Sequence, residues 1–193
     1  MLEEPIRLAV IIGGVQGSHF APVLGNWFAD EAKQRADVSL DVVDLAVEKP
    51  LPLTRPVLSP VVAGALAAIS PRLAAADAFV VVTPEYNHSF PALLKNTIDW
   101  HLAEWRAKPV GFVCYGGRSG GLRAVEQLRQ VFCELHAVSI RDTISFHGDD
   151  TFDEHGRPKD PEGCDAAAKK MLDQLVWWAA ALRDARAKHP YSA

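Results

Sequence analysis

Short apolar runs bounded by Gly, Pro or Asp recur along the chain. The first ends abruptly at Gly13-Gly14, another at Pro84 and a third at Gly116-Gly117. Continuous apolar runs of this length are typical of strands that are covered on both faces, as in a parallel sheet. Two weaker runs, SLDVVD and VSIRDTIS, complete the set. The pattern predicts five strands, at Arg7–Ile12, Ser39–Asp44, Ala78–Thr83, Pro109–Tyr115 and Val138–Ser145.

Segments with helical period lie between these runs. In the first of them, Val23, Leu24, Trp27 and Phe28 fall on one side of a helix and charged residues fall on the other. This is the pattern of a helix that packs one face on a core. The predicted helices are Phe20–Gln34, Val61–Ala76, Ala92–Trp105, Gly121–Leu135 and Ala166–Lys188. The proline-rich segment Lys49–Pro60 is predicted to be an exposed loop, and Gly148–Gly163 a polar loop.

Strict alternation of strand and helix predicts right-handed crossovers and a three-layer α/β sandwich. The chain of 193 residues is expected to form a single domain over residues 1–193. In an open α/β sheet, ligands bind beyond the carboxyl ends of the strands where the winding reverses. With the five-strand order 2-1-3-4-5, three loops would line one pocket there: Gly13–His19 (GGVQGSH), Pro84–Phe90 (PEYNHSF) and Gly116–Gly121 (GGRSGG).

The loop Gly13–His19 leads directly into a predicted helix. A helix N-terminus offers unpaired N–H groups and a partial positive charge, which suit a phosphate group. The spacing of GGVQGSH matches neither GxGxxG nor GxxxxGK[ST], so it does not indicate a dinucleotide fingerprint or a P-loop. A tight turn that binds no ligand is the alternative interpretation of this loop.

Composition and charge exclude several classes of protein. The net charge is −4, and the 20 Lys and Arg are scattered along the chain, so nucleic acid is not an expected partner. No apolar run is long enough to span a membrane, and two Glu precede the first apolar run in place of a basic signal region, so a cytoplasmic location is expected. The three Cys form no CxxC pair and the seven His never fall at i, i+4, so no metal site is predicted.

Two longer motifs resemble those of a known family. TPEYNHSFPALLKNTIDW (Thr83–Trp100) and YGGRSGGLRAVEQLR (Tyr115–Arg129) are similar to motifs of the NADPH-dependent FMN reductases, flavodoxin-like proteins that include quinone, chromate and azo reductases. The resemblance runs from Arg7 to Ser145. It implies a flavodoxin-like enzyme in which NADPH or NADH delivers hydride to FMN, leaves, and is replaced by a small-molecule electron acceptor. The flavin then carries the chemistry, so no catalytic residue is named.

The resemblance also implies which residues contact FMN. The first loop would hold the phosphate, the second would run along the isoalloxazine ring, and the third would approach the other edge of the ring. A homodimer or homotetramer is expected in this family, with the region of Asp99 and Trp100 at the interface. The expected cofactor-binding residues are Gly14, Val15, Gln16, Ser18, His19, Pro84, Glu85, Tyr86, Asn87, Tyr115, Gly116, Gly117 and Arg118.

The phosphate loop departs from the family pattern. Family members often have Ser where this chain has Gly14, and Arg where it has Gln16, so a bidentate Arg–phosphate contact is missing. Since His19 is charged only toward acidic pH, we expect FMN binding that is weaker or more pH-sensitive than in relatives with the Arg. Two alternatives follow: an electron carrier that docks on proteins, and a member of the family that has lost its flavin.

Individual residues have competing interpretations. Cys114 is expected to be a small buried hydrophobe, and Glu85 a structural contact in preference to a general acid. His88 could face substrate, a neighbouring subunit or solvent. Arg118 is expected to serve the site or an interface. Three tryptophans are expected in the core or at an interface: Trp105, Trp177 and Trp178.

Overall fold

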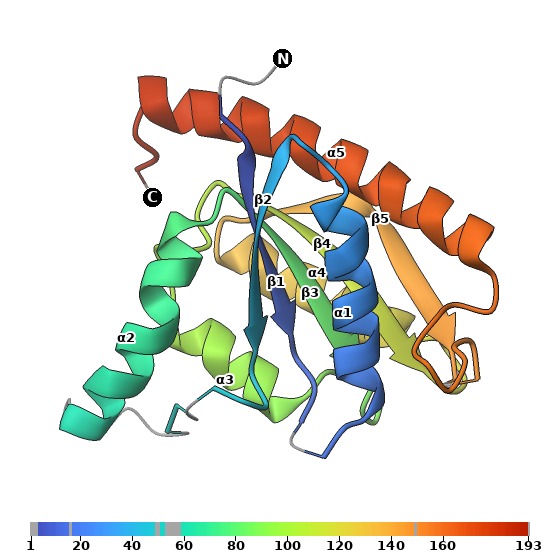
Figure 1. Ribbon diagram of the computed structural model, residues 1–193. Helices are drawn as coiled ribbons and strands as arrows, with labels where there is room; N and C mark the ends of the chain where they lie inside the picture. Colours follow the sequence, from blue (N-terminus) through green and yellow to red (C-terminus); the bar gives the residue numbers. More distant parts are fainter. Residues whose placement is uncertain (1–3, 16, 49–50, 53–58, 149, 193) are drawn as a thin grey trace.

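Five parallel strands form one sheet in the order β2-β1-β3-β4-β5 (Figure 1). The structure is a computed structural model that describes residues 4–15, 17–48, 51–52, 59–148 and 150–192. The strand order confirms the prediction, and each strand lies within two residues of its predicted bounds. The strands are β1 (Ile6–Ile12), β2 (Val38–Asp44), β3 (Ala78–Pro84), β4 (Pro109–Gly116) and β5 (Val138–His147).

Five helices connect and follow these strands. Three of them match the predicted helices to within one residue at each end. The third helix is shorter than predicted, and the last begins five residues earlier. The helices are α1 (Phe20–Lys33), α2 (Pro60–Ala75), α3 (Ala92–Trp100), α4 (Leu122–Glu134) and α5 (Pro161–Lys188).

The early end of α3 corrects the predicted helix, which ran to Trp105. His101 has extended backbone angles, and the following residues form turns. The Trp105 indole N–H donates to the carbonyl of His101 at 2.8 Å, and the ring is fully buried against Phe79 and Phe132. Trp105 is therefore a core residue, but a turn places it there rather than a continued helix.

The early start of α5 has a local cause that is readable in the sequence. Asp160 is the N-cap residue, its carboxylate accepts a hydrogen bond from the Gly163 N–H, and Pro161 occupies the first turn. Both residue types are favoured at these positions. At the other end of the helix, Trp177 and Trp178 are 63% and 38% exposed, so neither belongs to the core of this chain.

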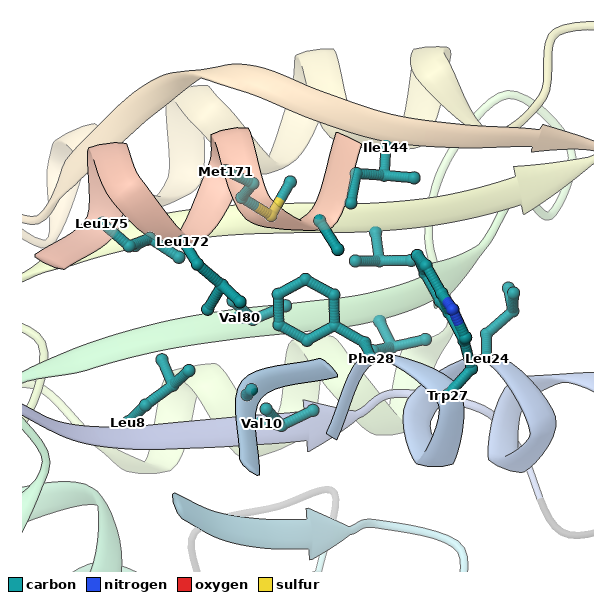
Figure 2. Packing of buried hydrophobic residues seen from close by; sticks show 14 of the residues in the cluster. Leu8, Val10, Leu24, Trp27, Phe28, Val80, Ile144, Met171, Leu172 and Leu175 are labelled. Atoms are coloured by element: carbon teal, nitrogen blue, oxygen red, sulfur yellow. The ribbon is translucent and has the colours of Figure 1, made fainter. Parts of the chain in front are cut away.

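Helices cover the sheet on both faces. Alternate residues of β1 and β3 point to opposite sides, with Val10 and Val80 packing beneath α1 and α5, as Figure 2 shows for Phe28 of α1 and Leu172 of α5. The other face packs against α2, α3 and α4. This double coverage is why the strands read as uninterrupted apolar runs, and it confirms the three-layer sandwich. Within the described residues, no helix has the length and apolarity needed to cross a bilayer.

Candidate FMN site

The three predicted loops lie together at the carboxyl edge of the sheet. The Gly13 N–H donates to the Val82 carbonyl at 2.8 Å, which ties the end of β1 to β3. The Glu85 N–H donates to the Tyr115 carbonyl at 2.9 Å, which ties the end of β3 to β4. These backbone bonds hold the three loop origins in fixed relative positions. The structure thus brings together the segments that the sequence assigns to one pocket.

Gly14 sits where the first loop turns against α1. A Cβ atom on this buried residue would lie 2.5 Å from the Cβ of Ala21, which is closer than real side chains approach. The position therefore requires glycine in this backbone, and the serine common in the family does not fit here. Val15 is partly buried beside it, whereas Gln16 lies outside the described residues.

The N-terminus of α1 faces the same edge and is only weakly capped. The N-cap residue His19 is exposed and its side chain makes no capping hydrogen bond, while the Ser18 hydroxyl accepts a long bond of 3.5 Å from the Ala21 N–H. The first turn of α1 contains no acidic residue. The first turn therefore places no negative charge against the positive end of the helix dipole, which is the arrangement that favours an anion.

A pair of hydroxyl groups links the first loop to the end of β4. The Ser18 Oγ and the Tyr115 hydroxyl lie 3.2 Å apart, and the Tyr115 ring packs edge-on against Phe20 with 5.0 Å between ring centroids. Burial raises the pKa of Tyr115, and the hydrogen bond with Ser18 only partly offsets this. Tyr115 therefore stays a neutral hydroxyl that can both donate and accept a hydrogen bond.

The second loop is a tight turn that projects its middle residues outward. Tyr86 and Ser89 exchange two backbone hydrogen bonds of 2.9 and 3.0 Å, and both residues between them have positive φ angles, 50° at Asn87 and 71° at His88. Gln127 of α4 donates to the His88 carbonyl at 2.8 Å and accepts from the Ser89 hydroxyl. Tyr86 is 42% exposed, and both middle residues are exposed. Pro84, by contrast, is buried in β3.

The Glu85 side chain is held by groups of the third loop and the start of α4. Its carboxylate accepts a short hydrogen bond from the Ser119 hydroxyl and a 3.2 Å bond from the Arg123 N–H at the start of α4. The Arg123 guanidinium lies 3.7 Å from the same carboxylate. These contacts match the expected structural role, because they fasten the second loop to the third.

In the third loop, Gly120 is held by hydrogen bonds, whereas Gly117 and Arg118 form an exposed half. The Gly120 carbonyl accepts bonds from the Cys114 thiol and the Ser145 hydroxyl, and Cys114 is fully buried, as expected. Gly117 and Arg118 are exposed, and a Cβ on Gly117 would meet nothing within 4 Å. Within the described part of the chain, the backbone N–H groups of these two residues and the Arg118 side chain have no hydrogen-bond acceptor.

Sequence reasoning missed the residues that brace these loops. Ser119, Gln127 and Ser145 hold the second and third loops from outside the expected contact set. Ser119 stands inside the glycine-rich loop and was detectable there as the only hydroxyl. Gln127 and Ser145 carry no such signal, since their partners are distant in sequence.

Comparison with known proteins assigns the fold and the family. The sequence model of the NADPH-dependent FMN reductases matches residues 6–151. The chain belongs to this family. Membership confirms the family that the two motifs predicted and, with it, an enzyme class that uses FMN together with NADPH or NADH.

Curated relatives and solved structures agree with the family. The chain is 33% identical to the NAD(P)H-dependent FMN reductase C4B3.06c of Schizosaccharomyces pombe over 68% of each chain. It is 30% identical to the NADPH:quinone oxidoreductase of Arabidopsis thaliana over 89% of this chain and 88% of the relative. The solved structure of FerB, a flavoenzyme NAD(P)H:(acceptor) oxidoreductase from Paracoccus denitrificans, has a TM-score of 0.73 at 22% identity, covering 90% of this chain and 97% of FerB.

The likeness to FerB and to an archaeal flavodoxin, with a TM-score of 0.58, identifies the fold as flavodoxin-like. The residues of this family member also fit the cofactor. The weakly capped α1 N-terminus suits the phosphate, and the N–H groups of Gly117 and Arg118, which have no acceptor among the described residues, suit the polar edge of a flat ring.

Proposed function

We propose that this protein is an FMN-dependent NAD(P)H oxidoreductase that reduces flavin, quinone or azo-type acceptors. The observation that carries the proposal is the junction of three features at one edge of the sheet. These are the weakly capped N-terminus of α1, the exposed turn Tyr86–Ser89 and the exposed half of the Gly116–Gly121 loop. The family and its relatives support the same activity.

The phosphate of FMN is proposed to bind at the start of α1. Ser18 would contribute its hydroxyl, which already lies beside the Tyr115 hydroxyl, and His19 would contribute an exposed imidazole. Gly14 and Val15 would contribute backbone by bringing the loop close to the helix. Most of the phosphate contacts would thus come from N–H and O–H groups of the chain, without a bidentate arginine.

The ring is proposed to lie between the second and third loops. Pro84, Glu85, Tyr86 and Asn87 would follow one edge, with the Glu85 carboxylate fixing the loop rather than reacting. Tyr115, Gly116, Gly117 and Arg118 would follow the other edge. The absence of a Cβ contact at Gly117 leaves room for a ring to approach the backbone.

When bound, FMN supplies the chemistry of the reaction by accepting a hydride and passing electrons to an acceptor. The residues of this chain bind and orient it, and they exclude water from one side of the pocket. We propose that the nicotinamide donor and the acceptor use the same open face in turn, which is ping-pong use of one pocket. This is the reason that no protein acid, base or nucleophile is assigned.

Two measurements test the proposal. Purified protein should be yellow, with absorption at about 450 nm, or should gain this band on addition of FMN. With saturating FMN it should oxidise NADPH or NADH steadily when a benzoquinone is present, and initial rates at several quinone concentrations should give parallel double-reciprocal lines. A protein that binds FMN but shows almost no turnover would instead be an electron carrier. A protein that binds no FMN would be a member that has lost its cofactor.

The expected homodimer or homotetramer stays a prediction. The segment that follows α3 exposes Leu102 at 48%, and an apolar side chain of this size on the surface is compatible with a subunit interface. Size-exclusion chromatography with light scattering measures the state directly. A monomer at working concentration would exclude any site built across subunits.

A further inference from the structure

A cavity that opens to solvent lies at the opposite, amino edge of the sheet. It has a volume of about 430 Å³ and is lined by residues from the last turn of α2, the segment between α3 and β4, and the C-terminal end of α5. Figure 1 shows the C-terminal residues, in red, descending beside the upper end of α2. The loops of the FMN site project from the other edge of the same sheet.

Three basic side chains line this cavity. Lys108 is only 7% exposed, and its ammonium group donates to the carbonyls of Leu73 and Ala74 at 3.1 and 2.9 Å. An ammonium group has three N–H donors; the described residues offer no third oxygen acceptor, and the ammonium lies 5.5 Å from the centroid of the Phe79 ring. Arg186 donates to the Ala107 carbonyl. The Arg106 guanidinium has no hydrogen bond or ion pair in the described chain.

Acidic side chains do not balance these cations. Asp77, 1% exposed, is the buried carboxylate nearby, and it is already engaged in two hydrogen bonds by the Arg7 guanidinium. Arg183 and Arg186 approach the same carboxylate at 3.6 and 3.7 Å. Glu104 is the only acidic side chain among the described residues that line the cavity, and it accepts a bond from the Leu102 N–H. The local charge is therefore strongly positive.

The excess of positive charge affects the basic groups themselves. Burial, and then repulsion by Arg186, lowers the pKa of Lys108 to about 8. Burial likewise lowers the pKa of Arg186, and Asp77 only partly opposes this. Cations that repel one another inside a cavity are stabilised when an anion enters it.

We propose that this cavity binds a small oxyanion, such as a phosphate or a carboxylate group. Arg106 supplies a planar fork of N–H donors that matches two oxygens of such a group, Lys108 supplies its third N–H, and Arg186 adds charge from α5. The ligand would join α2, the start of β4 and α5, which are distant in sequence. This site is separate from the FMN site and does not depend on the proposed enzymatic function.

Calorimetric titration of the full chain with inorganic phosphate tests the proposal. The protein is first saturated with FMN, so that the phosphate position at α1 is filled, and ionic strength is held constant with chloride because salt screens such contacts. We expect one saturable phosphate site per chain. A parallel titration with succinate shows whether a carboxylate group serves as well as a phosphate group. Binding of neither anion would overturn the proposal.

Two variants give opposite expectations. Arg106→Gln should weaken phosphate binding about tenfold, because a charge-assisted donor is lost. Glu104→Gln should strengthen it about threefold, because the opposing carboxylate is lost. Both side chains lie at the cavity surface, and Arg106 has no partner in the described chain, so folding should not change.

Matched controls locate the site. Arg141→Gln removes the same charge from a side chain that is 89% exposed on β5, and it should leave phosphate affinity unchanged. Phosphate titration of His19→Ala without FMN shows whether the bound phosphate lies at the start of α1 instead. Equal effects of Arg106→Gln and Arg141→Gln, or phosphate binding that responds only to His19→Ala, would show that the amino-edge cavity is not an anion site.

Discussion

The two edges of the sheet use charge in opposite ways. At the carboxyl edge, the candidate FMN site presents backbone N–H groups, hydroxyls and a helix N-terminus, and the Arg118 guanidinium is exposed. At the amino edge, the buried Asp77 lies among three guanidinium groups, of which Arg7 is 58% exposed and Arg183 and Arg186 are 22% exposed. The two proposed sites differ in kind: FMN would meet mainly uncharged donors at the carboxyl edge, whereas an oxyanion would meet basic side chains that Asp77 does not balance at the amino edge. The comparison teaches that a site can attract an anion either through backbone and hydroxyl donors or through an excess of basic side chains.

The largest expected effect comes from breaking the buried ion cluster. Asp77→Asn should lower the free energy of unfolding by about 3 kcal/mol at pH 7, because the three guanidinium groups around this buried position lose their counter-charge. Burial acts to raise the pKa of Asp77, but hydrogen bonds from Arg7 outweigh it and hold the pKa below its usual 3.8. The carboxylate thus stabilises the fold fully above the unfolded-state pKa, and this is lost as the pH falls through the lower folded-state pKa.

Urea unfolding of the wild type and of Asp77→Asn, from pH 7 down to pH 3, measures the stabilisation by the Asp77 carboxylate and its loss at low pH. The control is Asp30→Asn, because the Asp30 side chain is 69% exposed and, among the described residues, forms its one ion pair with Lys33 on the surface. That variant should change the unfolding free energy by less than about 0.5 kcal/mol. Equal losses in the two variants would mean that the buried cluster contributes no more than a surface pair.

At the carboxyl edge, substitution of one glycine should change stability, and substitution of another should change FMN affinity. Gly14→Ala places a Cβ 2.5 Å from Ala21 and should lower the unfolding free energy by about 1–3 kcal/mol. Gly117→Ala meets no protein atom within 4 Å, so it should leave stability unchanged. If the ring lies against Gly117, the added methyl group should weaken FMN binding about tenfold.

Thermal unfolding of the apoprotein and fluorescence titration with FMN measure the two effects separately. Gly64→Ala is the matched control, because a Cβ at this exposed position of α2 also meets nothing within 4 Å and Gly64 is not in the proposed contact set. It should affect neither FMN affinity nor, beyond a small gain, stability. Unchanged FMN affinity in Gly117→Ala would remove this residue from the proposed contact set.

The smallest expected effect concerns His19. An exposed imidazole beside the phosphate would add one surface contact, so His19→Ala should weaken FMN binding about threefold. Fluorescence titration of the wild type and the variant with FMN measures the ratio of the two affinities. Equal affinities would exclude the proposed contact with His19.

The sequence predicted the scaffold better than the ends of its helices. Strands buried on both faces have an unmistakable pattern, so β1, β3 and β4 lie within one residue of their predicted bounds. The helix predicted to reach Trp105 failed because a buried tryptophan delivered by a turn has the same spacing as one on a helix. The start of α5 was recoverable from Asp160 and Pro161, which are capping residues.

For the candidate site, the sequence located the loops because their backbone geometry requires particular residue types. The three loops were found from their glycines and their place after apolar runs. Most of the predicted Pro-rich segment, residues 49–50 and 53–58, lies outside the described residues, but Leu51 within it is buried and accepts a bond from Asn96. Contacts of this kind, like that between Gln127 and His88, depend on which helix passes a loop. The local sequence of a loop does not show which helix will pack against it.

The backbone bonds that join the strand ends have a consequence for how such a pocket changes over generations. Main-chain atoms alone form the bonds from Gly13 to Val82 and from Glu85 to Tyr115, so these bonds do not depend on particular side chains. A pocket whose frame is main chain tolerates replacement of its side chains one at a time, each shifting affinity without dismantling the frame. Loss of a phosphate-binding arginine in such a lineage is then a single adjustable step, and the binding preference of the pocket can drift while its architecture stays in place.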